Sequence, residues 1–173
     1  MPTDTIYGLV GSALSRNTVE RIYGVRKRKP EKPFVILIAS MGDLNLFKIK
    51  TDNFSKKTLN RVWPGKISVI LPCPHKKFAY LHRGTKGLAF RLPDKTWLRK
   101  LLKKTGPLVA PSANPEGLAP AKNIKEAKKY FGKKIDFYAG GKKPDKLSST
   151  LIQIKNKKII ILRQGKVKIK KTI

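Results

Sequence analysis

An unbroken apolar run at residues 34–39 (FVILIA) restricts the fold of this chain more than any other segment. A strand with one face in solvent alternates apolar and polar residues, whereas a strand buried on both faces reads as a continuous apolar run. Strands of the second kind occur in sheets that helices cover on both sides. The run therefore predicts a fully buried strand in an α/β fold.

Further apolar runs alternate with amphipathic stretches along the chain. Strands are expected at residues 67–71, 88–92, 107–110, 135–138, 151–154 and 159–162, and residues 5–9 read as a strand that runs into a glycine turn. Helices are expected at residues 17–25, 43–47, 55–63, 94–104 and 123–131. The residues after Gly165 are expected to form a terminal strand or a loose end. The alternation predicts one α/β domain with a mixed sheet.

Capping residues mark the starts of three of these helices. Asn17 with Glu20, and Asn123 with Glu126, have the three-residue spacing of a capping box, in which each side chain bonds a backbone N–H of the other residue's turn. Ser55 is a candidate cap for the helix that ends near the Trp-Pro-Gly break after residue 62.

Composition places the chain among globular proteins. Its 173 residues are enough for one hydrophobic core, with 40% hydrophobic and 29% charged residues. The single cysteine, Cys73, excludes a disulfide within the chain and suits a reducing compartment. No apolar run approaches the roughly 18 residues of a membrane span, and no signal-peptide pattern opens the chain. We therefore expect a soluble, cytoplasmic domain with no membrane segment.

The charge is strongly positive, with 40 lysines and arginines against 10 aspartates and glutamates and a formal net charge of +30. A field of that sign attracts polyanions such as RNA and ATP. Lysine-rich composition bias is the alternative, because lysines are scattered over nearly every segment, including a solvated helix face at residues 125–134. The net charge by itself does not decide between these explanations.

Two polar clusters flank the first predicted elements, at strand ends where open α/β sheets place their ligands. Residues 3–8 (TDTIYG) bring hydroxyls and a carboxylate to one spot. Residues 26–33 (RKRKPEKP) hold five positive charges in seven residues, which could neutralise a triphosphate, with arginines suited to forked contacts. A solvated charge run is the alternative for the second cluster.

Two more polar features follow later strands. Arg91 alternates with apolar residues at the end of a short strand, where its guanidinium could meet a carboxylate or point to solvent. Residues 111–117 (PSANPEG) combine small residues, which let a ligand approach the backbone, with the hydrogen-bonding side chains of Ser112 and Asn114. An ordinary turn is the alternative there.

Several familiar chemistries are missing from the sequence. His75 and His82, near Cys73, lack the paired spacing of a zinc site. The chain contains no P-loop, which argues against a P-loop ATPase. It contains no G-x-S-x-G elbow and has two histidines, so a Ser-His-Asp hydrolase is not expected. We therefore predict no metal ligand and no catalytic nucleophile, and any reaction must rely on positioning and charge neutralisation.

Seven segments together resemble the threonylcarbamoyl-AMP synthase family, the YrdC-type domain: PTDTIYGL, RKRKPEKPFVILI, WPGKISVIL, GLAFRLP, PSANPEG, SSTLIQI and ILRQG. They occur in the family's order and extend from Pro2 to Gly165. The resemblance implies a single twisted, mixed-sheet α/β domain of YrdC/RibB-like fold over residues 1–173, with a basic concave face. It also implies that this chain lacks the helix and first strand that family members carry before the first motif.

The resemblance implies an L-threonylcarbamoyladenylate synthase, a nucleotidyltransferase that makes threonylcarbamoyl-AMP and pyrophosphate from L-threonine, bicarbonate and ATP. Its product would feed tRNA threonylcarbamoyladenosine biosynthesis through a downstream tRNA threonylcarbamoyl-transferase complex. Threonine carbamate is the nucleophile on the α-phosphate, so no protein nucleophile is required, and Mg²⁺ accompanies ATP. The alternative is an RNA-binding module of the same fold without synthase activity, for which the net charge is the motive. A carbamoyl-transfer domain related to hydrogenase maturation is a third reading, although such domains sit in much longer chains.

Site residues carried over by motif fall into two groups. Those implied to bind threonine, with the arginine on its carboxylate, are Thr5, Arg91, Ser112 and Ser149. Those implied to bind ATP are Arg26, Arg28, Lys32, Asn114 and Arg163. Two departures from the family pattern affect the second group. Arg26 stands where the family usually has lysine, and Glu116 brings a negative charge near the proposed phosphate site.

Overall fold

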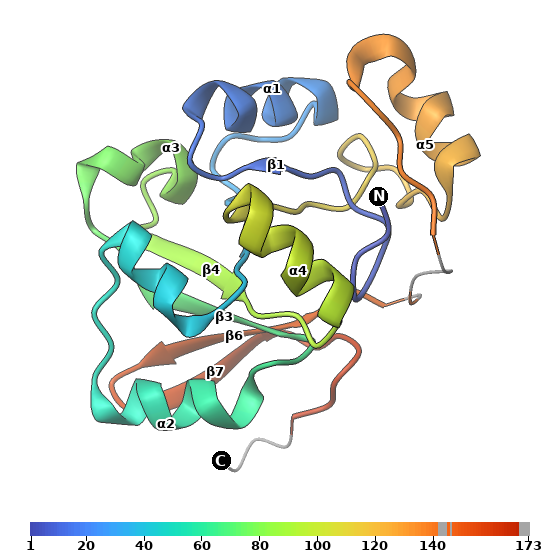
Figure 1. Ribbon diagram of the computed structural model, residues 1–173. Coiled ribbons are helices and arrows are strands. Elements are labelled where there is room, and N and C mark those ends of the chain that lie inside the picture. Colours follow the sequence, from blue (N-terminus) through green and yellow to red (C-terminus); the bar gives the residue numbers. More distant parts are fainter. Residues whose placement is uncertain (142–144, 146, 170–173) are drawn as a thin grey trace.

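A mixed seven-stranded sheet forms the centre of the computed structural model, which describes residues 1–141, 145 and 147–169 (Figure 1). The strand order is β1-β5-β2-β4-β3-β6-β7. The strands are β1 (Gly11–Ser12), β2 (Val35–Leu37), β3 (Ile67–Pro72), β4 (Gly87–Arg91), β5 (Leu108–Val109), β6 (Thr150–Lys155) and β7 (Lys158–Arg163). β2 runs parallel to β4 and β3 runs parallel to β6, while the other neighbours are antiparallel. The predicted α/β fold with a mixed sheet is confirmed.

Helices surround this sheet. They are α1 (Arg16–Arg26), α2 (Asn53–Val62), α3 (Ala79–His82), α4 (Thr96–Thr105) and α5 (Ile124–Phe131), with short 3₁₀ turns η1 (Met41–Phe47), η2 (Lys76–Phe78) and η3 (Gly132–Lys134). Three of the helices begin on side chains that accept a backbone N–H: Ser15, Asp52 and Asn123. Asn123 was the predicted cap of α5, but the predicted caps Asn17 and Ser55 are wrong. In each of those cases a polar residue two or three positions earlier accepts the N–H of the third helical residue, which is Thr18 in α1 and Ser55 in α2.

The strand predicted at residues 34–39 is buried on both faces, as its composition requires. Ile36 and Ile38 face the main core, whereas Leu37 packs with Leu98 and Leu102 of α4 in a second, smaller core. All five side chains are essentially inaccessible to solvent. Because successive side chains of a strand point to opposite faces, this strand contributes side chains to both cores. Helix α4, in front of the sheet in Figure 1, covers the smaller core.

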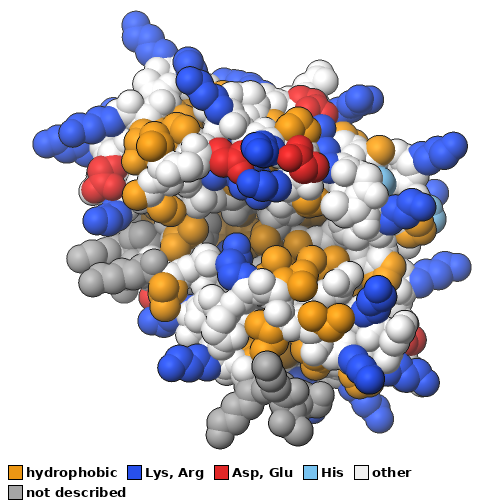
Figure 2. Space-filling model, turned by 180° about the vertical axis from the view of Figure 1, so that it is seen from behind, with side chains coloured by type: hydrophobic (Ala, Val, Ile, Leu, Met, Phe, Trp, Pro, Cys, Tyr) orange, Lys and Arg blue, Asp and Glu red, His pale blue; other side chains and the backbone are white. Residues whose placement is uncertain are grey.

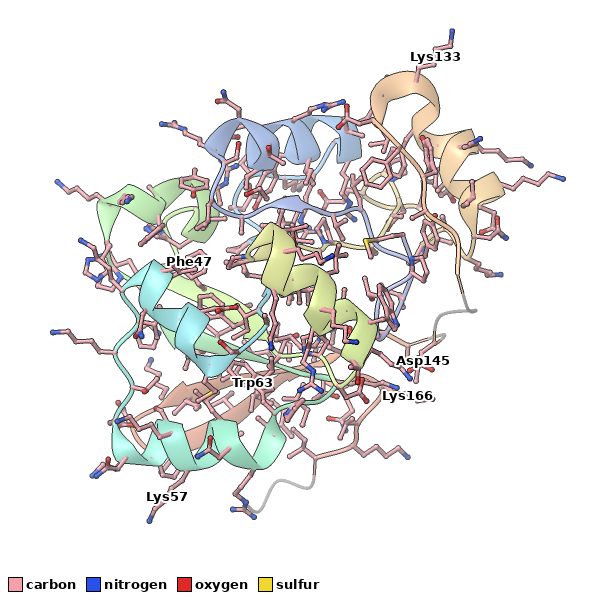
Figure 3. All side chains as sticks on the ribbon, viewed as in Figure 1. Phe47, Lys57, Trp63, Lys133, Asp145 and Lys166 are labelled. Carbon is pink, nitrogen blue, oxygen red and sulfur yellow. The ribbon has the colours of Figure 1, made fainter. Side chains whose placement is uncertain are left out.

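The main core joins the remaining helices to the other face of the sheet. Phe47 packs near Phe90 of β4 and Phe78, with ring centroids 5.1 and 5.5 Å away. Trp63 closes the end of α2, and its indole N–H donates a 2.8 Å hydrogen bond to the carbonyl of Ile67. Figure 3 shows Phe47 and Trp63 inside the fold, whereas Lys57 and Lys133 project from its outline. Many of the lysines are thus spread over solvated surfaces.

Two predicted strands are absent from the described residues. Residues 135–138 form no strand; Arg21 instead bonds the carboxylate of Asp136 and the carbonyl of Lys134, which ties this segment to α1. Residues 5–9 make only isolated bridges, Pro2 to Tyr7 and Gly8 to Ser112. There the hydroxyl of Thr3 bonds its own neighbours and competes with a regular ladder.

The chain after β7 folds back beside the segment that leads into β6. The N–H of Gly165 donates a 2.9 Å hydrogen bond to the hydroxyl of Thr150, and the N–H of Lys166 donates to the carbonyl of Ser148. The expected terminal strand is not present at residues 166–169, but this segment is not loose, because Val167 and Ile169 pack on the core. Within the part of the chain that the structure describes, no helix is long and apolar enough to cross a membrane.

Gly165 lies so close to the residues before β6 that a side chain has no space. A Cβ atom there would overlap the carbonyl oxygen of Ser148 and the carbonyl group of Ser149. We expect Gly165→Ala to lower the free energy of unfolding by about 1–3 kcal/mol, because the backbone must shift. Denaturant unfolding followed by circular dichroism measures the change.

The matched control is Gly24, an exposed glycine inside α1 where an added Cβ would have no atom within 4 Å. Gly24→Ala should raise the free energy of unfolding by about 0.5–1 kcal/mol, since alanine restricts the unfolded chain and favours a helix. Equal effects of the two alanines would contradict the packing described for Gly165.

Candidate functional site

A pocket of about 500 Å³ lies over the middle of the sheet. Strands β2, β3, β4, β6 and β7 contribute to its wall, together with the loops at residues 110–112 and 148–149. Apolar side chains such as Ile70 and Leu151 alternate there with hydroxyls and guanidinium groups. A cavity of this size and mixed lining suits a small molecule.

Six of the nine site residues predicted from the sequence line this pocket. They are Thr5, Arg28, Arg91, Ser112, Ser149 and Arg163. They come from separate parts of the chain, so the fold has gathered them from segments that are far apart in the sequence. Arg26, Lys32 and Asn114 do not line it, and their predicted contacts with a nucleotide stay predictions.

The pocket lining is basic. It contains Arg28, Lys86, Arg91 and Arg163, and no aspartate or glutamate occurs among the described lining residues. Burial lowers the pKa of Arg163, and the nearby charges of Arg91 and Arg28 lower it further. Positive groups that disfavour one another's charge are relieved when an anion binds between them. The electrostatics of the pocket therefore favour an anionic ligand.

Arg91 enters the pocket from the end of β4 and is tied to the segment at residues 3–8. Its Nη2 donates to Oδ1 of Asp4 at 2.8 Å and to the hydroxyl of Thr5 at 3.4 Å. The sequence left open whether Arg91 points inward or to solvent; in the structure the residue is 3% exposed and its side chain lines the pocket. Thr5 and Arg91 form one polar corner of the pocket.

Ser149 and Arg163 form a second corner beside β6. The Ser149 hydroxyl lies 2.8 Å from the hydroxyl of Ser68. Arg163, at the end of β7, donates from Nε and Nη2 to the carbonyl oxygen of Ser149 at 3.2 and 2.9 Å. The backbone carbonyl holds the guanidinium without neutralising it, so the charge of Arg163 stays available to a ligand.

Arg26 supports the loop at residues 112–118 from behind. It is 2% exposed, and its Nε donates to the carbonyl of Asn114 at 2.9 Å. Its Nη2 donates to the hydroxyl of Ser112 and to Oδ1 of Asn114 at 3.2 and 3.3 Å. Burial lowers the pKa of Arg26 to about 10. Asn114 in turn donates from its amide to the carbonyls of Pro115 and Leu118. The two residues hold the position of Ser112.

Glu116 links the basic segment at residues 26–33 to the same loop. Oε1 accepts from the ammonium group of Lys32 at 2.5 Å and Oε2 accepts from the N–H of Lys29 at 2.6 Å. The N–H of Glu116 donates to the carbonyl of Arg26 at 2.8 Å. The negative charge noted in the sequence therefore does not enter the pocket lining; it pairs with Lys32, a predicted ATP ligand.

Sequence reasoning missed four polar lining residues: Thr85, Lys86, Ser148 and Gln153. Gln153 could have been found, because it stands two residues after Leu151 on the same face of β6. Lys86 and Thr85 precede β4 in a turn whose residues carry no pattern of their own. Figure 2 shows Lys and Arg side chains at many places along the outline of one face, with hydrophobic side chains in the hollow at its middle. Against that background a single lysine gives no signal.

A divalent cation finds few protein ligands here. Within the described residues no group of three or more His, Cys, Asp or Glu side chains is placed to hold a metal ion. The described pocket lining offers hydroxyls but no carboxylate, the ligand that Mg²⁺ usually takes from proteins. The pocket therefore does not fit a protein-held Mg²⁺, and the Mg²⁺ expected with ATP stays a prediction.

Comparison with known proteins gives consistent similarities. The sequence model of the Sua5/YciO/YrdC family, described as "Telomere recombination", matches residues 1–165. The threonylcarbamoyl-AMP synthase of Bacillus subtilis is 32% identical over 95% of this chain and 48% of its own length. That of Marinobacter nauticus is 30% identical over 84% of this chain and 80% of its own length.

Among solved structures, Pyrococcus abyssi Sua5 complexed with L-threonine superposes with a TM-score of 0.86 and 29% identity. The match covers 95% of this chain and 49% of that one. This chain thus spans about half the length of the Bacillus subtilis and Pyrococcus abyssi relatives.

The Glu116 link has a measurable titration. The hydrogen bond from Lys32, then that from the N–H of Lys29, lowers the pKa of Glu116 from 4.5 to about 2. Because this value lies below that of an unfolded chain, the link stabilises the fold above pH 4.5 and is lost as the pH falls through about 2. We expect an NMR titration of the Glu116 carboxyl carbon to give a pKa near 2.

Lys32→Gln should raise that pKa toward 4.5, since it removes the ammonium group. Lys29→Gln is the matched control, because only the backbone of Lys29 bonds Glu116 and the pKa should stay near 2. A wild-type pKa near 4.5 would show that the two loops are not linked through this carboxylate.

Proposed function

The chain belongs to the Sua5/YciO/YrdC family, and from that premise we propose that it is an L-threonylcarbamoyladenylate synthase. The substrates would be L-threonine, bicarbonate and ATP, and the products threonylcarbamoyl-AMP and pyrophosphate. The named relatives and the L-threonine complex of the Pyrococcus abyssi protein support this proposal over an RNA-binding module without activity.

One observation carries the proposal: three guanidinium groups and five hydroxyls from distant segments meet in a pocket whose described lining has no carboxylate. The reaction needs such a site, because it must hold the carboxylate of threonine and the phosphates of ATP together. Mutual repulsion of these anions has to be offset before they can react. A pocket with several unneutralised cations supplies that offset.

Each residue then has a proposed role. Arg91 would hold the threonine carboxylate with a charge-assisted hydrogen bond, while the hydroxyls of Thr5, Ser112 and Ser149 would bind its polar groups. Arg28 and Arg163 would contact the phosphates. Lys32 would join them if it exchanged Glu116 for a phosphate oxygen.

The chemistry requires no nucleophile from the protein. Threonine's amine and bicarbonate first form a carbamate with loss of water. A carbamate oxygen then bonds to the α-phosphorus of ATP as the bond to the bridging oxygen breaks, and pyrophosphate leaves. Charge grows on the bridging oxygen during this step, where Arg28 and Arg163 would stabilise it. Mg²⁺ would enter with the nucleotide, held by its phosphates.

The proposed place of the product is upstream of a tRNA threonylcarbamoyl-transferase complex, and contact with tRNA or other RNA is proposed from the net charge of +30. If the chain were instead an RNA-binding module, binding of unstructured RNA would fall steeply with salt and ATP would not bind. ATP binding that survives about 300 mM salt while RNA binding is lost would favour the synthase.

We expect the purified chain to release pyrophosphate from ATP only when L-threonine, bicarbonate and Mg²⁺ are all present. Arg163→Gln should lower this rate at least about tenfold, because it removes a charge-assisted contact of about 1.5–3 kcal/mol. A coupled assay for pyrophosphate measures both rates.

Arg61→Gln is the control, since Arg61 is exposed on α2 and does not line the pocket. Its rate should stay within about twofold of wild type. Absence of threonine-dependent release by wild type, or equal losses in the two variants, would overturn the proposed function.

A further inference from the structure

We propose that Asp4 is a positioning residue that orients Arg91 and sets this corner of the pocket for a carboxylate rather than a phosphate. The inference rests on the proposed function, because it names threonine as the ligand of Arg91. Asp4 does not line the pocket, and it acts only through the side chain that does.

The two side chains form a buried ion pair. Oδ1 of Asp4 and Nη2 of Arg91 are 2.8 Å apart, and the side chains are 0% and 4% exposed. Arg91 lines the candidate pocket, whereas Asp4 lines a separate cavity of about 540 Å³ that also borders Lys66 and Trp97. The carboxylate thus approaches the guanidinium from the side away from the proposed ligand.

Asp4 is itself fixed by a tight turn. The N–H and the hydroxyl of Thr3 both donate to the carbonyl of Ile6, at 3.2 and 2.7 Å, and Pro2 bridges to Tyr7. On the other side, the carbonyl of Arg91 accepts from the N–H of Ile38 at 3.0 Å, in the central strand pair. Both members of the ion pair therefore stand on backbone that is held by its own hydrogen bonds.

The Asp4–Arg91 pair has one hydrogen bond fewer than a bidentate contact between a carboxylate and a guanidinium. Oδ2 of Asp4 and Nε of Arg91 are buried and make no hydrogen bond to any of the described residues. An arginine has five N–H donors, and among the described residues Arg91 has partners only at Nη2, which are Asp4 and Thr5. The bonds to Asp4 and Thr5 hold the Nη2 end of the guanidinium in place and leave other donors for a ligand carboxylate.

Asp4 also sets the local charge. Arg28, Arg91 and Arg163 lie around one pocket, and Asp4 is the carboxylate paired with one of them. Because Arg91 is already paired with Asp4, this corner suits a singly charged carboxylate held by geometry. Arg28 and Arg163 have no such partner in the described lining, so that part of the pocket suits phosphate. Asp4 would thereby separate the amino acid end of the pocket from its nucleotide end.

Isothermal titration calorimetry of the full chain with L-threonine, L-threoninamide, inorganic phosphate and ATP tests this inference. We expect Asp4→Asn to raise the Kd for L-threonine about tenfold or more, to remove the preference for threonine over its amide, and to change the Kd for ATP less than about twofold. Inorganic phosphate should bind at least as tightly as to wild type. A loss that came only from unfolding would weaken every ligand together.

Asp136→Asn is the matched control, because Asp136 forms an exposed pair with Arg21 and should change none of these values. Should Asp4→Asn fail to fold, Asp4→Glu decides, since it keeps the charge but moves the carboxylate and should still weaken threonine alone. If wild type binds threonine and a folded Asp4 variant binds it equally well, the inference is overturned by itself. If wild type binds no threonine, the proposed function falls and takes the inference with it.

Discussion

Repulsion among three guanidinium groups around one pocket is the constraint on which the rest of the site depends. Arg28, Arg91 and Arg163 all line the pocket, and Arg163 has a lowered pKa in part because of the other two. Two of them are held by backbone carbonyls and the third by a carboxylate. Arg28 donates to the carbonyl of Lys32, Arg163 donates to the carbonyl of Ser149, and Arg91 has a carboxylate. The fold thus keeps positive charge concentrated where an anion would relieve it.

Local patterns were sufficient to predict most of the sheet and the face on which it is buried. The run at residues 34–39 became a strand shared between two cores, because continuous apolar sequence has no polar residue to give to solvent. Residues 135–138 (IDFY) are also predicted as a strand from their apolar and aromatic content, yet they form no strand in the described structure. Whether such a segment becomes a strand depends on whether a sheet edge is free beside it, and that is a property of the whole fold. The same limit applies to the segment at residues 5–9, where hydroxyl groups satisfy the backbone locally.

The sequence predicted which residues line the pocket better than it predicted which residues bond one another. Thr5, Arg91, Ser112 and Ser149 follow from motifs, and the fold does bring them to one pocket. Asp4 was visible only as part of a polar cluster, since its partner lies 87 residues away in the sequence. Likewise, the sequence did not reveal that Arg26 bonds the loop of Asn114 or that Lys32 pairs with Glu116. Contacts between distant segments decide whether a basic residue faces a ligand or supports a neighbour.

The central claim is that these cations serve the adenylation of a threonine carbamate. The most direct measurement is mass spectrometry of the product after the chain is incubated with ATP, L-threonine, Mg²⁺ and ¹³C-labelled bicarbonate. The account predicts a threonylcarbamoyl adenylate that carries one ¹³C atom, formed together with an equal amount of pyrophosphate. A folded chain that binds ATP and threonine but yields no labelled adenylate would contradict it.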